Sequence, residues 1–92
     1  MTVYNINSIK SEKTTSVSIY PNPNDGAFTL EFPNPKSNQV HIIINDITGK
    51  TVFETTTTQE LYNYTGNKLQ SGIYLVTVKG VDSLNVSKMV VK

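Results

Sequence analysis

The sequence predicts an all-β fold, an antiparallel two-sheet sandwich of about seven strands. β-Branched Thr, Val and Ile supply 30 of the 92 residues, whereas Ala27 is the only alanine, and such side chains favour strands over helices. Clusters of Asn, Gly and Pro recur roughly every 8–12 residues, a spacing typical of sandwiches. Two layers are expected because a single sheet of this size could not hide its apolar face.

One domain is expected at residues 17–92, preceded by a polar segment at residues 1–16. We interpret that segment as a linker tail because its apolar residues do not alternate, with an added edge strand as the alternative. A chain of 92 residues buries only a modest core. The strands expected in the domain are residues 17–20, 27–32, 39–47, 50–57, 60–65, 73–79 and 85–91.

Composition limits the possible functions. The net charge is +1, with eight lysines and no arginine, so clustered basic charge for nucleic acid is missing. The longest runs of aliphatic residues and methionine have three residues, so neither a membrane span nor a signal-peptide core is expected. No cysteine is present, so neither a disulfide nor a thiolate metal site contributes.

The first expected strand, Val17–Tyr20, runs into the turn Pro21-Asn22-Pro23-Asn24-Asp25-Gly26. Proline cannot donate to a strand ladder, so two prolines in three residues end the pairing. Gly26 is free to adopt a positive φ. We expect a rigid corner. The alternative is a cation-binding loop of Asn22, Asn24 and Asp25, but one carboxylate is too little charge for calcium, and no metal is predicted.

The next two strands alternate between a dry face and a wet face. His41 falls on the wet face and is the only histidine. No nucleophile or paired carboxylate stands at a recognisable spacing from it, so we expect a surface residue and no enzyme. The residues expected on the dry faces are Phe28, Leu30, Phe32, Val40, Ile42 and Ile44.

The middle of the chain combines a hairpin with an aromatic strand. Asp46–Lys50 is expected to form a tight turn with a glycine bulge, with Gly49 in the left-handed region. Thr55–Thr58 is compatible with a solvated strand. Tyr62 and Tyr64 share a face and are expected to be half-buried core residues, although a sugar-binding strip is the alternative. Leu69 is expected to be buried before the final hairpin.

The final two strands have the clearest period-two order. Tyr74, Val76 and Val78 share one face of the first. Met89 and Val91 share one face of the second, and Lys88, Val90 and Lys92 share the other face.

Several short motifs in a fixed order resemble the C-terminal sorting domain of type IX secretion cargo. They are YPNP followed by Gly26, DITGK at Asp46–Lys50, Leu69 before Gly72-Ile73-Tyr74, and KMVVK at Lys88–Lys92. The resemblance covers about residues 17–92 and implies an Ig-like seven-stranded sandwich. It also implies a set of sorting-motif residues, namely Pro21, Asn22, Pro23, Gly26, Gly49, Gly72, Tyr74, Lys88, Met89, Val90, Val91 and Lys92.

The resemblance further implies how the domain is used. A cargo domain lies upstream, enters the periplasm, and passes through an outer-membrane translocon with its shuttle proteins to the cell surface or medium. A surface sortase-like peptidase then removes the sorting domain by cutting within residues 8–16, and can exchange it for lipopolysaccharide. The domain is expected to be a monomer without a cofactor.

We expect the last two strands to form the docking surface, because a terminal edge strand can be recognised by strand addition. Lys88 and Lys92 would supply charge contacts, and the Pro21–Gly26 corner would stabilise the fold. The alternative is that Met89 and Val91 merely complete the core. Two other functions stay open: a carbohydrate-binding module with Tyr20, Tyr62 or Tyr64 as platforms, which the absence of Trp disfavours, and a structural spacer.

Overall fold

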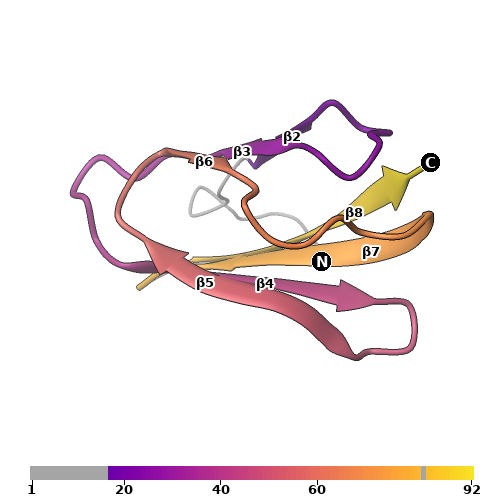
Figure 1. The fold of residues 1–92 in the computed structure, drawn as a ribbon. Coiled ribbons are helices and arrows are strands. Elements are labelled where there is room, and N and C mark those ends of the chain that lie inside the picture. Colours follow the sequence, from indigo (N-terminus) through magenta and orange to yellow (C-terminus); the bar gives the residue numbers. More distant parts are fainter. Residues whose placement is uncertain (1–16, 82) are drawn as a thin grey trace, which may run out of the picture.

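A computed structural model describes residues 17–81 and 83–92, which form seven strands and no helix (Figure 1). The all-β prediction is therefore confirmed. The predicted tail at residues 1–16 lies outside the described residues. The strands are β2 (Ser18–Tyr20), β3 (Thr29–Glu31), β4 (Val40–Asp46), β5 (Thr51–Thr57), β6 (Leu61–Asn63), β7 (Gly72–Lys79) and β8 (Leu84–Val91).

The strands form two antiparallel sheets, as expected for an Ig-like sandwich. One sheet has the order β2-β3-β6 and the other has the order β5-β4-β7-β8. Figure 1 shows the smaller sheet lying over the larger one. Within the described part of the chain, no helix has the length and apolarity needed to cross a membrane.

The core lies between the two sheets and is built from the predicted dry faces. Alternate residues of β4 and β7 are buried, and the largest fully buried side chains come from four strands: Leu30, Ile42, Ile44, Val76 and Met89. Leu69, from the loop before β7, is also buried at 8% exposure. The predicted inward faces are thus confirmed, including Met89 and Val91 on β8.

The β4–β5 turn confirms the predicted left-handed glycine. Gly49 has a φ of 91°, and the Asp46 N–H donates to the Lys50 carbonyl at 2.9 Å. The extra residue of the bulge lies in β5, after Gly49. Ile44 opposes Phe53, and the next residue, Asn45, opposes Thr51. Val52 is therefore the bulged residue.

The aromatic residues of β6 and its flank pack inward. Tyr64 stacks on Phe28 with ring centroids 4.8 Å apart, and it meets Phe53 in a T-shaped contact at the same distance. Tyr62 lies tilted against Phe53. Gly66 is required beside them, because a Cβ there would overlap the Tyr64 ring and hydroxyl. The half-buried core role predicted for both tyrosines is confirmed.

Candidate functional site

The structure brings together two of the predicted motifs, the turn at residues 21–26 and the last residues of β8. Figure 1 shows the turn that follows β2 beside the C-terminus. Asn24 forms a parallel bridge with Val91, so the chain leaves the smaller sheet at this corner and joins the edge of the larger one. The peptide bonds Tyr20–Pro21 and Asn22–Pro23 are both cis.

Among the strands that the structure describes, β8 is an edge strand, with β7 on one side only. In an antiparallel pair, alternate residues direct their N–H and C=O groups toward the partner strand. The Val90 N–H and C=O bond to the corner instead of β7. The same alternation directs the backbone of Leu84, Val86 and Lys88 outward.

The corner closes the outward edge at the end of β8. Two residues provide the contacts, and we call Asn22 and Asn24 the asparagine clasp. Asn22 accepts the Val90 N–H on Oδ1 at 3.0 Å and donates from Nδ2 to the Lys88 carbonyl at 3.2 Å. Asn24 donates its backbone N–H to the Val90 carbonyl at 3.0 Å and accepts the Lys92 N–H at 2.8 Å.

The possibility that the backbone edge is open throughout the last strand is therefore wrong from the Lys88 carbonyl onward. The Lys88 carbonyl, the Val90 N–H and C=O and the Lys92 N–H have intramolecular partners, so an incoming strand would have to displace the clasp there. The predicted rigid corner, in contrast, is supported by its own hydrogen bonds. Buried Asn24 donates from Nδ2 to the Pro21 carbonyl at 3.0 Å and accepts the Gly26 N–H on Oδ1 at 2.8 Å.

Gly26 completes the corner in a left-handed conformation with φ of 107°. A Cβ there would lie 3.1 Å from the Lys68 Cγ and 3.4 Å from the Leu69 carbonyl oxygen. The corner thus packs tightly on the loop that carries Leu69 into the core. The positive φ and the close approach to Lys68 together explain why glycine occupies this position.

The remaining sorting-motif residues lie near the clasp or form turns. Gly72 pairs with Val91, and Tyr74 pairs with Met89. The buried Tyr74 donates its hydroxyl to the Gln70 carbonyl at 2.7 Å. Gly49 stands apart from the clasp, in the β4–β5 turn. Pro21 and Pro23 flank Asn22 and are exposed.

The side chains at the end of β8 divide between core and surface. Met89 and Val91 are 0% and 2% exposed, whereas Lys88 and Lys92 are exposed and Val90 is half-buried. The ion pair within the described residues joins His41 and Glu54 on another part of the larger sheet. Among those residues, neither Lys88 nor Lys92 has an anionic partner.

Sequence analysis missed the apolar character of the outer face of β7 and β8. Ile73 and Leu75 on β7 are 45% and 43% exposed, and Leu84 and Val86 on β8 are 65% and 55% exposed. The signal was present, because both strands carry apolar residues at odd and even positions. A period-two pattern alone assigns one face of a strand to the core and does not predict that the other, solvent-facing side is apolar as well.

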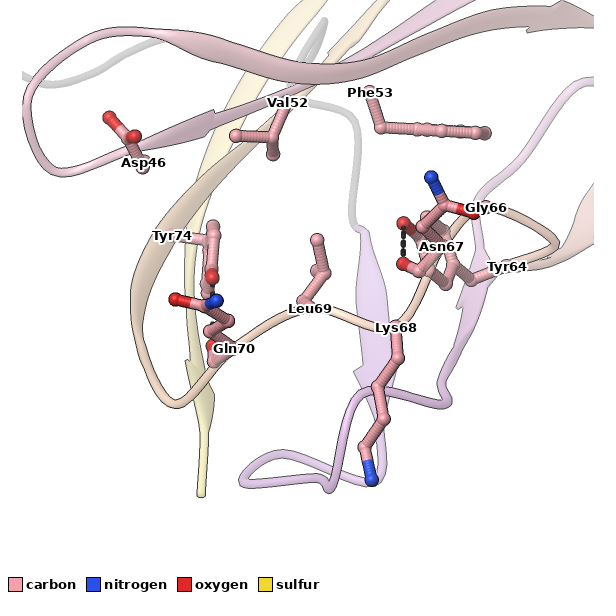
Figure 2. A pocket seen from close by; sticks show the side chains of 10 residues that line it. All are labelled: Asp46, Val52, Phe53, Tyr64, Gly66, Asn67, Lys68, Leu69, Gln70 and Tyr74. Carbon is pink, nitrogen blue, oxygen red and sulfur yellow. Dashed lines mark hydrogen bonds between the residues drawn. The ribbon is translucent and has the colours of Figure 1, made fainter.

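An open groove of about 550 Å³ is lined by residues that include Phe53, Tyr64, Leu69 and Tyr74. Figure 2 shows the side chains that line it. The Tyr64 hydroxyl donates to the Asn67 carbonyl at 2.6 Å, and burial raises the Tyr64 pKa. Its ring stacks on Phe28. Tyr64 is therefore committed to the core, which argues against its use as a sugar platform.

Tyr20 and the acidic residues that the structure describes make local contacts. The Tyr20 hydroxyl donates to Glu31 at 3.0 Å, and this hydrogen bond raises the Tyr20 pKa. Across residues 17–81 and 83–92, no three His, Cys, Asp or Glu residues are grouped to hold a metal ion. Asp25 accepts the Ala27 N–H at 3.3 Å, which is a turn contact.

Residues 18–92 match the family described as the secretion system C-terminal sorting domain. No curated protein matches the chain. A similar solved structure is PorZ, described as an essential bacterial surface component of the type-IX secretion system of human oral-microbiomic Porphyromonas gingivalis. The TM-score is 0.65 at 21% identity, over 83% of this chain and 11% of the PorZ chain. At this identity the likeness shows a shared fold.

Proposed function

The chain belongs to the secretion system C-terminal sorting domain family, and from this we propose which of its surfaces the type IX export machinery recognises. The domain is the C-terminal sorting signal of type IX secretion cargo, so its parent protein is secreted to the cell surface. We propose that the outer-membrane translocon and its shuttle proteins bind the exposed side chains of β7 and β8, with Lys88 and Lys92 supplying charge contacts.

The division of residues 88–92 between core and surface supports this proposal. Met89 and Val91 are buried, and the asparagine clasp holds the intervening backbone. Lys88 and Lys92 are thereby presented from a fixed segment, which lowers the entropy lost on binding. The core role and the docking role of this segment are compatible, because they use alternate side chains.

The rest of the export route is inferred from the family. The cargo domain would lie upstream and pass through the periplasm. A surface sortase-like peptidase would then cut within residues 8–16, before β2. We further propose that the domain acts as a monomer and not as an enzyme. The placement of His41 on the outer face of the sheet, where its imidazole contacts Glu54, supports the last point.

A reporter exported by a bacterium with a type IX secretion system tests the docking proposal. The double variant Lys88→Ala, Lys92→Ala should lower extracellular reporter several-fold, while changing stability by no more than about 0.5 kcal/mol, as exposed substitutions usually do. The matched control is Lys36→Ala, Lys50→Ala, which removes two exposed lysines from loops outside β7 and β8.

Full export of the Lys88→Ala, Lys92→Ala variant would contradict the proposal. Deleting residues 88–92 is a weaker test, because it removes Met89 and Val91 from the core. Circular dichroism of the shortened domain should show lost β structure. Loss of export after that deletion would therefore report unfolding.

A further inference from the structure

The outward edge of β8 has a closed part and an open part. The clasp bonds the Lys88 carbonyl, both Val90 backbone groups and the Lys92 N–H. Toward the start of the strand, the outward groups include the Val86 N–H and C=O and the Lys88 N–H. Within residues 17–81 and 83–92, none of these three has a hydrogen-bond partner. The outward backbone groups of Val86 and the Lys88 N–H are therefore open to a further strand within that part of the chain.

The side chains of this open part differ from those of a protected edge. Proteins usually guard exposed edge strands with charged residues, proline or a bulge. The opposite edge of the sheet, β5, has a bulge at Val52 and is rich in Thr, with Glu54 exposed. The open part of β8 instead exposes Leu84 at 65% and Val86 at 55%, and Lys88 is its one charge.

Charge indicates what could bind here. Strands β7 and β8 carry Lys79 and Lys88 and no acidic residue. A second copy of β8 would bring another basic strand, so self-association gains nothing from charge. An extended segment with apolar and acidic side chains would complement both the exposed Leu84 and Val86 and the two lysines.

We propose that residues 84–88 receive, by strand addition, a short extended segment of the export machinery that carries apolar and acidic side chains. The incoming backbone would bond the Val86 N–H and C=O and the Lys88 N–H. The clasp occupies the Lys88 carbonyl and so ends the added ladder at this residue. This inference rests on the proposed function, because it takes the partner to belong to the export machinery.

Proline at position 86 tests the proposal directly. The Val86 N–H faces away from β7, so Val86→Pro removes a docking donor without breaking the β7–β8 ladder. Thr56 on β5 is in an equivalent position, because the pairs Leu84–Lys79, Lys79–His41 and His41–Thr56 connect the two edges. The alternation of inward and outward backbone groups therefore directs the Thr56 N–H away from β4. Thr56→Pro is therefore the matched control on the opposite edge.

The assay uses a fluorescent reporter fused upstream of the full chain in a type IX-competent bacterium. We expect Val86→Pro to lower extracellular reporter about tenfold or more, as lost main-chain pairing predicts, and Thr56→Pro to leave it nearly unchanged. Both purified domains should melt near the parent temperature. If Val86→Pro does not fold, Val86→Lys decides instead, because lysine on an edge discourages strand pairing.

Normal export of a folded position-86 variant would overturn the inference. The proposed sorting function would survive that result if removal of residues 17–92 still abolished export, and would itself fail if export persisted. A parent domain that is dimeric by sizing, and monomeric after Val86→Pro, would assign the edge to a second copy and also overturn the inference. If the incoming segment is acidic, Lys88→Glu must lower export further than Lys88→Ala. Equal export of these two variants would exclude an acidic segment.

Discussion

Asn22 accepts the Val90 N–H at 3.0 Å across 68 residues of sequence, and through Nδ2 it also donates to the Lys88 carbonyl. A single side-chain amide thus satisfies two outward groups of the edge strand. Asn22 lies in the turn that joins β2 to β3, two strands of the smaller sheet. The contact ties the two sheets together where β8 ends.

Replacing Asn22 should loosen this end of the sheet. Asn22→Ala removes both hydrogen bonds and should lower the free energy of unfolding by about 1–2 kcal/mol, since each net bond contributes about 1 kcal/mol. It should also speed hydrogen exchange at the Val90 amide. Urea unfolding and amide exchange measure the two effects.

Asn67→Ala is the matched control, because the Asn67 side chain has no hydrogen bond among the described residues and only its carbonyl is used. It should leave both measurements nearly unchanged. Equal exchange at Val90 in the two variants would show that the clasp does not protect the edge.

The sheet framework could be predicted because each strand carries its own local signal. Each of the seven strands lies within two residues of its predicted range. The largest differences are in β3 and β6, which are shorter than predicted. Their pairing nevertheless continues, since the Tyr64 N–H donates to the Phe28 carbonyl and the Phe32 N–H to the Glu60 carbonyl.

The clasp could not be predicted in the same way. The sequence places Asn22 in a turn motif and in an alternative cation-binding loop, and nothing in the local pattern indicates a partner at Val90. Asn34 was missed for the same reason. It resembles an ordinary loop asparagine in the sequence, yet it is 8% exposed and bonds the backbone of its own turn, at Asn38, and of Thr58 after β5.

Asn34 should contribute more to stability than its loop position suggests. Its Nδ2 donates to the carbonyls of Asn38 and Thr58 at 2.8 and 3.1 Å, and its Oδ1 accepts the Asn38 N–H at 3.2 Å. Asn34→Ala should cost about 2–3 kcal/mol, because it leaves partly buried backbone groups unpaired. Chemical denaturation measures the loss.

Asn38→Ala is the control for Asn34, because Asn38 contributes only backbone atoms to this network. Its cost should stay within about 0.5 kcal/mol, as for other exposed positions. Similar costs for the two variants would rule out a network centred on the Asn34 side chain.

Alanine substitutions at Gly26 and Gly49 distinguish the cost of a positive φ from the cost of steric crowding by a Cβ. Both glycines have positive φ, at 107° and 91°. A Cβ at Gly26 would lie only 3.1 Å from the Lys68 Cγ, whereas a Cβ at Gly49 would meet nothing within 4 Å. Gly26→Ala should therefore destabilise the domain more than Gly49→Ala, whose strain alone costs about 1 kcal/mol. Thermal unfolding of both variants measures the difference, and equal losses would show that the corner tolerates a methyl group.

Asp46 should make the β4–β5 turn sensitive to acid. Its Oδ1 accepts the Thr48 hydroxyl at 2.6 Å and the backbone N–H groups of Thr48 and Lys50 at 2.9 and 3.1 Å. The Thr48 hydroxyl contact is the main cause that lowers the Asp46 pKa below its ordinary value of 3.8, and the backbone contacts add to it. Because the folded pKa is the lower one, this contribution to stability is complete above the ordinary value. It is lost as the pH falls through the folded pKa.

Asp46→Asn should therefore flatten the dependence of unfolding free energy on pH below about 4, where an unfolded aspartate begins to bind protons. Urea unfolding at a series of pH values measures this slope. Asp25→Asn removes the same charge from a different turn and is the control for net charge. If the Asp46→Asn domain lost stability in acid as steeply as the parent, the Thr48 and backbone hydrogen bonds would not be the source of the acid sensitivity. The slope would then have to come from other carboxylates of the domain.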